Sequence, residues 1–105
     1  MNQILIDQDD NNKTFDAKVG DIITITLREN ATTGYRWKVE GVDEKIILME
    51  DSKYSITSDN RIGSGGTRTF TFRPQSLGKA KVQLSLKREW EKQPMDLFVV
   101  HIQIT

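Results

Sequence analysis

The residues that could perform covalent or acid–base chemistry are few in this chain. It contains no cysteine, and its one histidine is His101. A serine or threonine nucleophile needs a base arranged beside it, and the sequence shows no recognisable arrangement of that kind. His101 has the opposite parity to the apolar residues of its segment, which predicts a solvent-facing strand residue rather than a general base. The sequence therefore predicts a protein that is not an enzyme.

The acidic segments give no sign of a metal or cofactor site. Residues 7–10, "DQDD", and 42–45, "VDEK", are typical of solvated loops. Neither has the ligand spacing of a calcium loop, and without cysteine there is no thiolate zinc site. No glycine-rich phosphate motif lies between a strand and a helix. We expect no metal and no cofactor.

Three other segments carry residues that are typical of binding surfaces. Residues 29–34, "ENATTG", form a longer connection than the Asn-Gly turn that a plain hairpin prefers. Residues 61–68, "RIGSGGTR", are either a flexible hairpin tip or a backbone surface that a partner approaches closely, since glycine lacks a Cβ. In "LKREWEKQPMD", Arg88 and Trp90 are of the types enriched at binding hot spots. Trp90 either folds back onto the protein or awaits a partner.

Strands must position these segments, because apolar residues recur at every second position along most of the chain. This alternation, with one wet face, is typical of antiparallel sheets. The expected inward residues are Ile23, Ile25, Leu27, Tyr35, Trp37, Val39, Phe70, Phe72, Ala80, Val82, Leu84, Leu86, Phe98, Val100, Ile102 and Ile104. Weaker strand candidates are "QILI", "TFDAKV", "KIILM" and "KYSIT". Turn signals separate the segments.

Seven or eight short strands predict an all-β fold, an immunoglobulin-like antiparallel β-sandwich without a disulfide, as a single domain over residues 1–105. Trp37 stands on an early strand, expected to be central, where such a sandwich keeps a core tryptophan. In this topology the three unusual segments emerge at the same end of the sandwich. They are therefore expected to form one surface.

Composition limits the partners and the compartment. Fifteen basic and fifteen acidic residues cancel to zero formal charge, which disfavours nucleic acid as a partner. No apolar run is long enough to span a membrane, and the N-terminus is unlike a signal peptide. The absence of cysteine favours a reducing compartment. Asn30-Ala31-Thr32 matches the glycosylation sequon, and a glycan there would cover the first unusual segment. We expect a cytoplasmic monomer.

The three segments together resemble the motifs of the chagasin family of cysteine peptidase inhibitors. The family's Asn-Pro-Thr-Thr-Gly-Tyr/Phe-x-Trp is matched by "NATTGYRW", its Gly-x-Gly-Gly by "GSGG", and its Arg-Pro-Trp/Phe by "REW". Order and separation agree over nearly the whole chain, and within the family the chain is similar to the amoebic members, the amoebiasins. The implied inhibitory residues are Asn30, Ala31, Thr32, Thr33, Gly34 and Tyr35 in the first motif, Gly63, Ser64, Gly65 and Gly66 in the second, and Arg88, Glu89 and Trp90 in the third.

The resemblance implies a reversible, tight-binding inhibitor that occludes the cleft of papain-like, cathepsin-like peptidases with three loops. Thr32 and Thr33 would occupy the active-site region, and Gly34 would let the chain turn there. Residues 64–66, from Ser64 to Gly66, would lie along the non-primed side through backbone hydrogen bonds. Arg88 and Trp90 would contact the primed side. Asn30 is expected to brace its loop, and Tyr35 and Trp37 to belong to the core.

Two residues depart from the family pattern, since Ala31 and Glu89 stand where the motifs have proline. Proline would restrict both itself and the residue before it, so the first loop loses that source of order. The alternative function is a β-sandwich recognition module that binds another protein or a glycan through the same loops. A small enzyme is the third class, and a dependence of its rate on His101 would be its sign.

Overall fold

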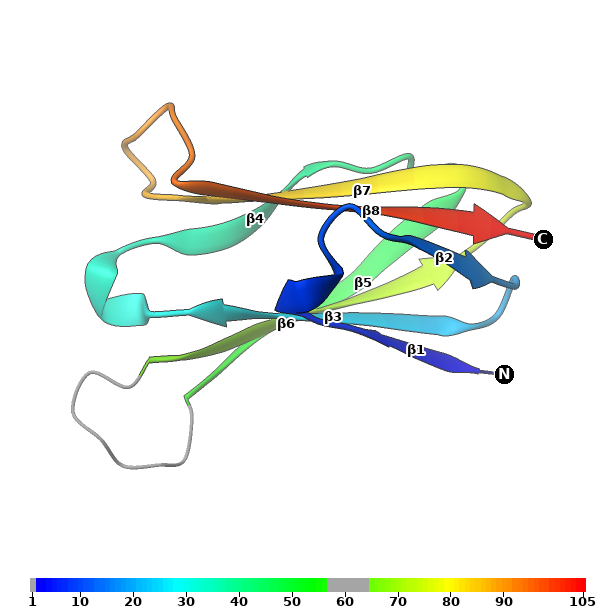
Figure 1. The fold of residues 1–105 in the computed structure, drawn as a ribbon, viewed down its shortest axis with the longest axis horizontal. Helices are drawn as coiled ribbons and strands as arrows, with labels where there is room; N and C mark the ends of the chain where they lie inside the picture. The colour runs from blue at the N-terminus through cyan, green and yellow to red at the C-terminus, as the bar shows by residue number, and fades with distance from the viewer. Residues whose placement is uncertain (1, 57–64) are drawn as a thin grey trace.

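Two four-stranded sheets pack face to face in the computed structural model, which describes residues 2–56 and 65–105 (Figure 1). One sheet has the order β1-β3-β6-β5 and the other β2-β8-β7-β4. The strands of the described part are β1 Gln3–Ile6, β2 Thr14–Ala17, β3 Ile22–Glu29, β4 Arg36–Gly41, β5 Ile47–Ile56, β6 Gly66–Pro74, β7 Gly78–Lys87 and β8 Asp96–Ile104. Two single-turn 3-10 helices, η1 Gln8–Asp10 and η2 Ala31–Thr33, join them. The all-β sandwich expected from the sequence is confirmed.

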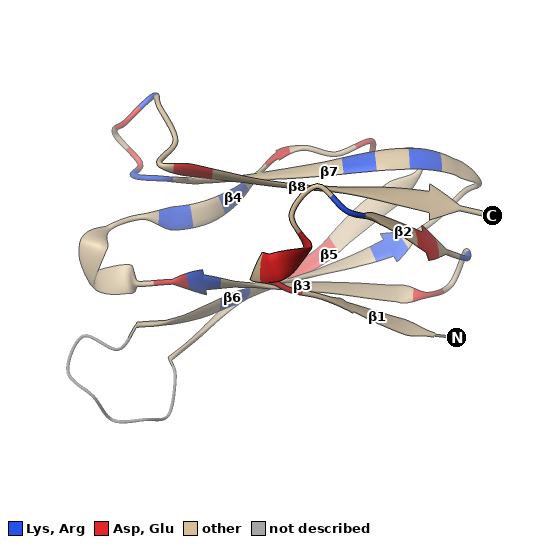
Figure 2. Cartoon of the chain, in the orientation of Figure 1, with Lys and Arg blue, Asp and Glu red and all other residues tan. Residues whose placement is uncertain are grey.

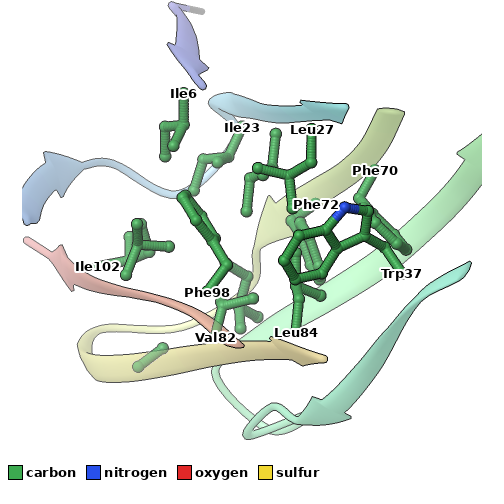
Figure 3. Close-up of a cluster of buried hydrophobic side chains, with 14 of the residues drawn as sticks. Ile6, Ile23, Leu27, Trp37, Phe70, Phe72, Val82, Leu84, Phe98 and Ile102 are labelled. Carbon is green, nitrogen blue, oxygen red and sulfur yellow. The ribbon is translucent and has the colours of Figure 1, made fainter. Parts of the chain in front are cut away.

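The core lies between the sheets and follows the predicted parity. Phe70 and Phe72 of β6 pair with Ile25 and Ile23 of β3, so these inward side chains face the other sheet together. The Trp37 ring lies in the same cluster as Phe72 and other large apolar residues (Figure 3). The fully or nearly fully buried hydrophobic residues are Ile6, Ala17, Ile23, Ile25, Leu27, Trp37, Ile47, Phe70, Phe72, Ala80, Val82, Leu84, Leu86, Phe98, Val100, Ile102 and Ile104. Tyr35 and Val39 are half-buried against this core.

Strand pairing departs from a purely antiparallel pattern at two edges. β1 pairs in parallel with β3, and β2 pairs in parallel with β8. The chain reaches these pairings by crossing from one sheet to the other between β1, β2 and β3. Alternation of side chains is the same in both kinds of pairing, so the pattern alone does not give the direction of an edge strand.

Trp37 is buried as expected, but its strand is not central. β4 is the edge of its sheet, because only β7 pairs with it. The side chain is buried because it reaches inward, and its indole Nε1 donates a hydrogen bond to the Arg28 carbonyl at 2.8 Å. A tryptophan on an edge strand can be buried when its side chain packs against the facing sheet.

Two further local expectations differ from the structure. Residues 47–49 of "KIILM" and 53–56 of "KYSIT" belong to one long strand, β5, which has a register shift between Met49 and Asp51. A bulge of this kind breaks the alternation, so the sequence reads as two short segments. Ser85 has the outward parity of β7 yet is fully buried, and its hydroxyl donates a hydrogen bond to Glu40 on the neighbouring strand β4.

The end of the sandwich that holds the start of β1 is fixed by Asp21. Its carboxylate accepts backbone N–H bonds from Lys18 at 2.9 Å and from Asn2 at 3.1 Å. These bonds favour the charged form, and the bond from Lys18 is the main reason that the pKa of Asp21 lies below its usual value. Stability that depends on the lowered pKa is present above about pH 4 and is lost as pH falls further through the folded-state value.

The first prediction concerns this carboxylate. Asp21→Asn is expected to destabilise the protein at neutral pH, because an amide cannot accept both backbone bonds without turning its NH₂ group toward one donor. As pH falls below about 4, the free energy of unfolding of the variant should fall less steeply than that of the parent, so the two curves converge in acid. Urea unfolding at each pH measures both. Parallel curves would show that Asp21 does not contribute.

The two ends of the sandwich carry different parts of the chain (Figure 1). The connections β3–β4 and β7–β8 lie at one end, and the start of β1 and the end of β8 lie at the other. Acidic and basic residues are spread over both sheets and the loops (Figure 2). No helix in the described residues is long and apolar enough to cross a membrane.

Candidate functional site

The loop end brings together described residues from all three sequence-predicted segments. Residues 30–35, the first loop, join β3 to β4, and residues 88–90 open the third loop between β7 and β8. Gly65 and Gly66 lead into β6 beside the first loop. Gly63 and Ser64, also expected to be inhibitory, lie outside the described residues. The expectation that these segments share one surface holds for the residues that the structure describes.

The first loop is a compact turn closed by hydrogen bonds of its own. Asn30 caps η2, and its Oδ1 accepts bonds from the Thr32 amide at 3.0 Å and the Thr32 hydroxyl at 2.6 Å. The Thr33 hydroxyl donates to the Asn30 carbonyl at 2.8 Å. These contacts agree with the bracing role expected for Asn30. They order the loop although Ala31 replaces the family proline.

Gly34 ends this turn in a conformation that suits glycine. Its φ is 82°, in the left-handed region, and its N–H bonds the Ala31 carbonyl at 3.2 Å. A Cβ at this position would lie 3.7 Å from the ring of Trp90 and 3.8 Å from the Arg88 side chain. These are ordinary contact distances, so it is the left-handed backbone of the turn that favours glycine at position 34.

Arg88 joins the third loop to the first. Its Nε donates to the Thr33 carbonyl at 3.0 Å, and its guanidinium lies 4.3 Å from the centre of the Tyr35 ring. A second nitrogen pairs with Glu91 at 3.3 Å. A cation held over an aromatic face and bonded to a carbonyl is restricted in motion. The two loops therefore form one unit.

Trp90 stands out from this unit. It is 74% exposed, so the alternative that it folds back onto the sandwich edge is wrong. Glu89 beside it is also exposed. Thr32 and Thr33 are exposed too, although their hydroxyls are engaged within the loop. The surface at this end thus presents an aromatic side chain and a threonine-tipped turn to solvent.

The glycine segment meets the first loop and then enters β6. At Gly65, φ is 74°, and a Cβ would lie 3.3 Å from the Asn30 Cβ. Gly66 is buried and pairs with Glu29 on one side and Ile56 on the other. A Cβ on Gly66 would collide with the Ser55 carbonyl oxygen. Gly66 is therefore a buried strand residue whose lack of a side chain lets β5 approach.

Gly66→Ala gives the second prediction. The added methyl must displace the backbone of β5, and overpacking of this kind typically costs about 1–3 kcal/mol of unfolding free energy. Gly41→Ala is the matched control, because nothing lies within 4 Å of a Cβ at Gly41. Urea denaturation should show a lower midpoint for the first variant only. Equal midpoints would mean that β5 accommodates the methyl group.

Two residues at the loop end were missed by the sequence interpretation, Glu29 and Arg68. Glu29 is only 3% exposed although it is charged, and Arg68 binds it through two nitrogens, each at 2.9 Å from a carboxylate oxygen. The alternation of inward and outward positions along β3 and β6 indicates this pair. Glu29 continues the inward series after Leu27, and Arg68 precedes Phe70 by two positions. Opposite charges at inward positions of two strands indicate a buried pair.

The arrangement is suited to binding rather than catalysis. The described residues contain no group of three or more side chains that could hold a metal ion, and His101 is exposed on β8 among strand residues. What the loop end offers is a rigid, partly apolar surface with ordered backbone. A β-sandwich with such loops defines a class of protein that acts by presenting loops to a macromolecular partner.

Comparison with known proteins specifies the class further. The model of the chagasin family of peptidase inhibitors, I42, matches residues 16–102. Amoebiasin-2 of Entamoeba histolytica is 30% identical over 85% of this chain and 72% of its own length, and chagasin of Trypanosoma cruzi is 32% identical over 76% of each. This chain belongs to the chagasin family of peptidase inhibitors and is not an enzyme.

Solved structures show the same fold. The cysteine protease inhibitor EhICP2 from Entamoeba histolytica superposes with a TM-score of 0.91 at 21% identity, covering 99% of this chain and 96% of that one. The Leishmania mexicana inhibitor ICP gives 0.68 at 26% identity, covering 91% and 90%. PbICP-C, solved in complex with falcipain-2, gives 0.71 at 18% identity, covering 98% and 89%. The architecture is therefore that of the inhibitor family along nearly its whole length.

Proposed function

We propose that this chain is a reversible, tight-binding inhibitor of papain-like cysteine peptidases that fills the active-site cleft with its loop end. The observation that carries the proposal is the closed first loop, tied internally through Asn30 and externally through Arg88. Family membership supports the activity, and the complex of the related PbICP-C with falcipain-2 supports the class of partner. Thr32 and Thr33 are the residues proposed to lie nearest the catalytic cysteine.

The geometry of the first loop explains why the inhibitor would not be cleaved. A peptidase acts on an extended peptide whose carbonyl is presented to the nucleophile. Residues Ala31–Thr33 form a 3-10 turn, and the Thr33 carbonyl is occupied by Arg88. To become a substrate, the loop would have to lose these bonds. A turn that is ordered before binding also loses little entropy on docking, which favours tight association.

Trp90 would supply the apolar contact beside this turn. It is exposed in the free protein, whereas Arg88 behind it is held by Tyr35 and Thr33. A tryptophan on a fixed base is typical of interface hot spots. An interface of ordinary size, about 800 Å² on each partner, would accommodate the two loops.

A titration of active-site-calibrated papain with the purified protein tests the proposal. Residual hydrolysis of a small fluorogenic peptide should fall linearly to near zero at one inhibitor per enzyme. The added protein should remain intact on a gel after the assay. No loss of activity at micromolar concentration, with a protein shown to be folded by its near-ultraviolet dichroism, would contradict the proposal and favour the recognition-module alternative.

We also propose a cytoplasmic location, on the basis of the sequon at Asn30. Its side-chain oxygen holds Thr32, and a glycan on its nitrogen would stand beside the surface that must enter the cleft. A compartment without N-glycosylation keeps that surface clear. Fractionation of cells with an antibody against the protein tests this, and recovery in a secreted, glycosylated form would contradict it.

A further inference from the structure

We infer that Glu29 and Arg68 are positioning residues of the inhibitor: their buried ion pair holds the first loop in the conformation that binds. This inference rests on the proposed function and adds residues that lie in none of the three motifs. The pair is set below the loop end rather than on its surface. The side chain of Glu29 is 1% exposed and that of Arg68 is 18% exposed, so neither presents a large contact area to a partner.

The Glu29 carboxylate is the meeting point of three strands. Its Oε1 accepts from the Trp37 amide of β4 at 2.6 Å and from Arg68 Nε of β6 at 2.9 Å. Its Oε2 accepts from Arg68 Nη2, also at 2.9 Å. Glu29 itself is the last residue of β3. A bidentate ion pair of this kind fixes the relative orientation of the two side chains as well as their distance.

The position of these bonds in the chain gives them their effect on the loop. Residues 30–36 lie between Glu29 and Trp37, so the bond between that carboxylate and that amide closes the base of the first loop. A second bond, from Trp37 Nε1 to the Arg28 carbonyl at 2.8 Å, closes it again one residue earlier. Without these bonds the two strands could separate where they belong to different sheets.

Arg68 connects this base to the glycine segment. It lies two residues after Gly66 on β6, and its own place is fixed by a 3.3 Å bond to Ser52 and by the Tyr54 ring at 5.6 Å. Gly65 in turn packs against Asn30 at the start of the loop. The pair therefore sets the first loop relative to the beginning of β6.

A buried ion pair is a poor source of stability, since apolar residues of similar size often serve as well. Its retention at the loop base is explained by the geometry it imposes. Ala31 supplies none of the restriction that proline would give to Asn30. The order of the loop must then come from its hydrogen bonds and from a fixed base, and Glu29 with Arg68 provides that base.

Glu29→Gln tests the inference with little change in shape. The amide can still accept from Trp37 but loses the charge that holds Arg68. If only a fraction of the free protein has the binding conformation, the observed association rate is the parent rate multiplied by that fraction, while the complex, once formed, dissociates as before. We expect the association rate with papain to drop about tenfold and the dissociation rate to change less than about twofold. A contact residue would change mainly the dissociation rate.

Glu50→Gln is the matched control, because Glu50 of β5 also pairs with an arginine of β6, Arg73, at 2.7 Å but is 39% exposed and does not touch the loop. It should leave both rates unchanged. The double variant Glu29→Met with Arg68→Met removes the unpaired charge and should recover unfolding stability relative to Glu29→Gln. Its association rate should remain low. Parent-like association by either Glu29 variant, or a loss confined to dissociation, would overturn the inference.

Hydrogen exchange of the free protein separates this inference from the proposed function. In Glu29→Gln, exchange at the Thr33 and Gly34 amides, both bonded in the parent, should accelerate about tenfold or more. Exchange of the β8 amides should not change. This result would support the positioning role even if papain proved not to be a target. Unaltered loop exchange would overturn it even if papain is inhibited.

Discussion

A variant carrying Thr32→Asp together with Thr33→Asp is expected to remain folded and to lose inhibition of papain by about a hundredfold or more. Both threonines are exposed at the tip of the first loop and would be enclosed by the cleft in the proposed complex. Two carboxylates enclosed there without partners would cost about 3 kcal/mol or more of binding free energy. The inhibition constant against papain measures the loss directly.

The control variant introduces two negative charges on a sheet face instead of at the first loop. Thr24 and Thr71 pair across β3 and β6 on the outer face of their sheet, and both are half-exposed. Thr24→Asp with Thr71→Asp should lower unfolding stability modestly, because like charges lie opposite one another, and should leave inhibition unchanged. If the loop variant inhibits as well as the parent, the first loop does not enter the cleft and the proposed binding mode is wrong.

Trp90→Ala is expected to weaken inhibition by about 2–4 kcal/mol, a factor of roughly thirty to a thousand. The indole is 74% exposed in the free protein, so its removal takes little from the folded state. A large aromatic surface that is buried only in the complex should appear almost wholly in the binding free energy. Titration of papain, with urea denaturation of the same preparation, measures both quantities.

Leu77→Ala is the comparison for Trp90→Ala. Leu77 is 69% exposed and lies between β6 and β7, at the end of the sandwich away from the loops. Both substitutions should change unfolding stability by less than about 0.5 kcal/mol. Only the first should change the inhibition constant. A Trp90→Ala protein that inhibits like its parent would exclude the third loop from the interface.

The alternation of apolar and polar residues predicted most of the fold, because each apolar residue marks the face of its strand that packs inward. Ile23, Ile25 and Leu27 are all buried, and the same holds for the apolar residues predicted to point inward on β7 and β8, from Ala80 to Leu86 and from Phe98 to Ile104 at every second position. What alternation lacks is pairing direction and order across the sheet. That is why the parallel edges of β1 and β2, and the edge place of β4 under Trp37, could not be read from it.

Site residues whose roles depend on local turn chemistry were predictable from the sequence. Residues whose roles depend on tertiary contacts were less so. The roles of Asn30 and Gly34 follow from local turn chemistry, which short polar residues and glycine reveal. The burial of Gly66 depends on how closely β5 approaches, a distance that no local pattern contains. Glu29 is hard to assign from the sequence because a charged residue beside a loop resembles a loop residue, although its parity continues that of Leu27.

The separation of the two ends of the sandwich has a practical consequence. β1 begins and β8 finishes at the end opposite the first and third loops (Figure 1). A fluorescent protein, an affinity tag or a solid support joined at either terminus therefore stands about the length of the sandwich away from the peptidase. Coupled to a resin through its C-terminus, the protein should retain full capacity to capture active peptidase from solution, because the loop end faces away from the resin.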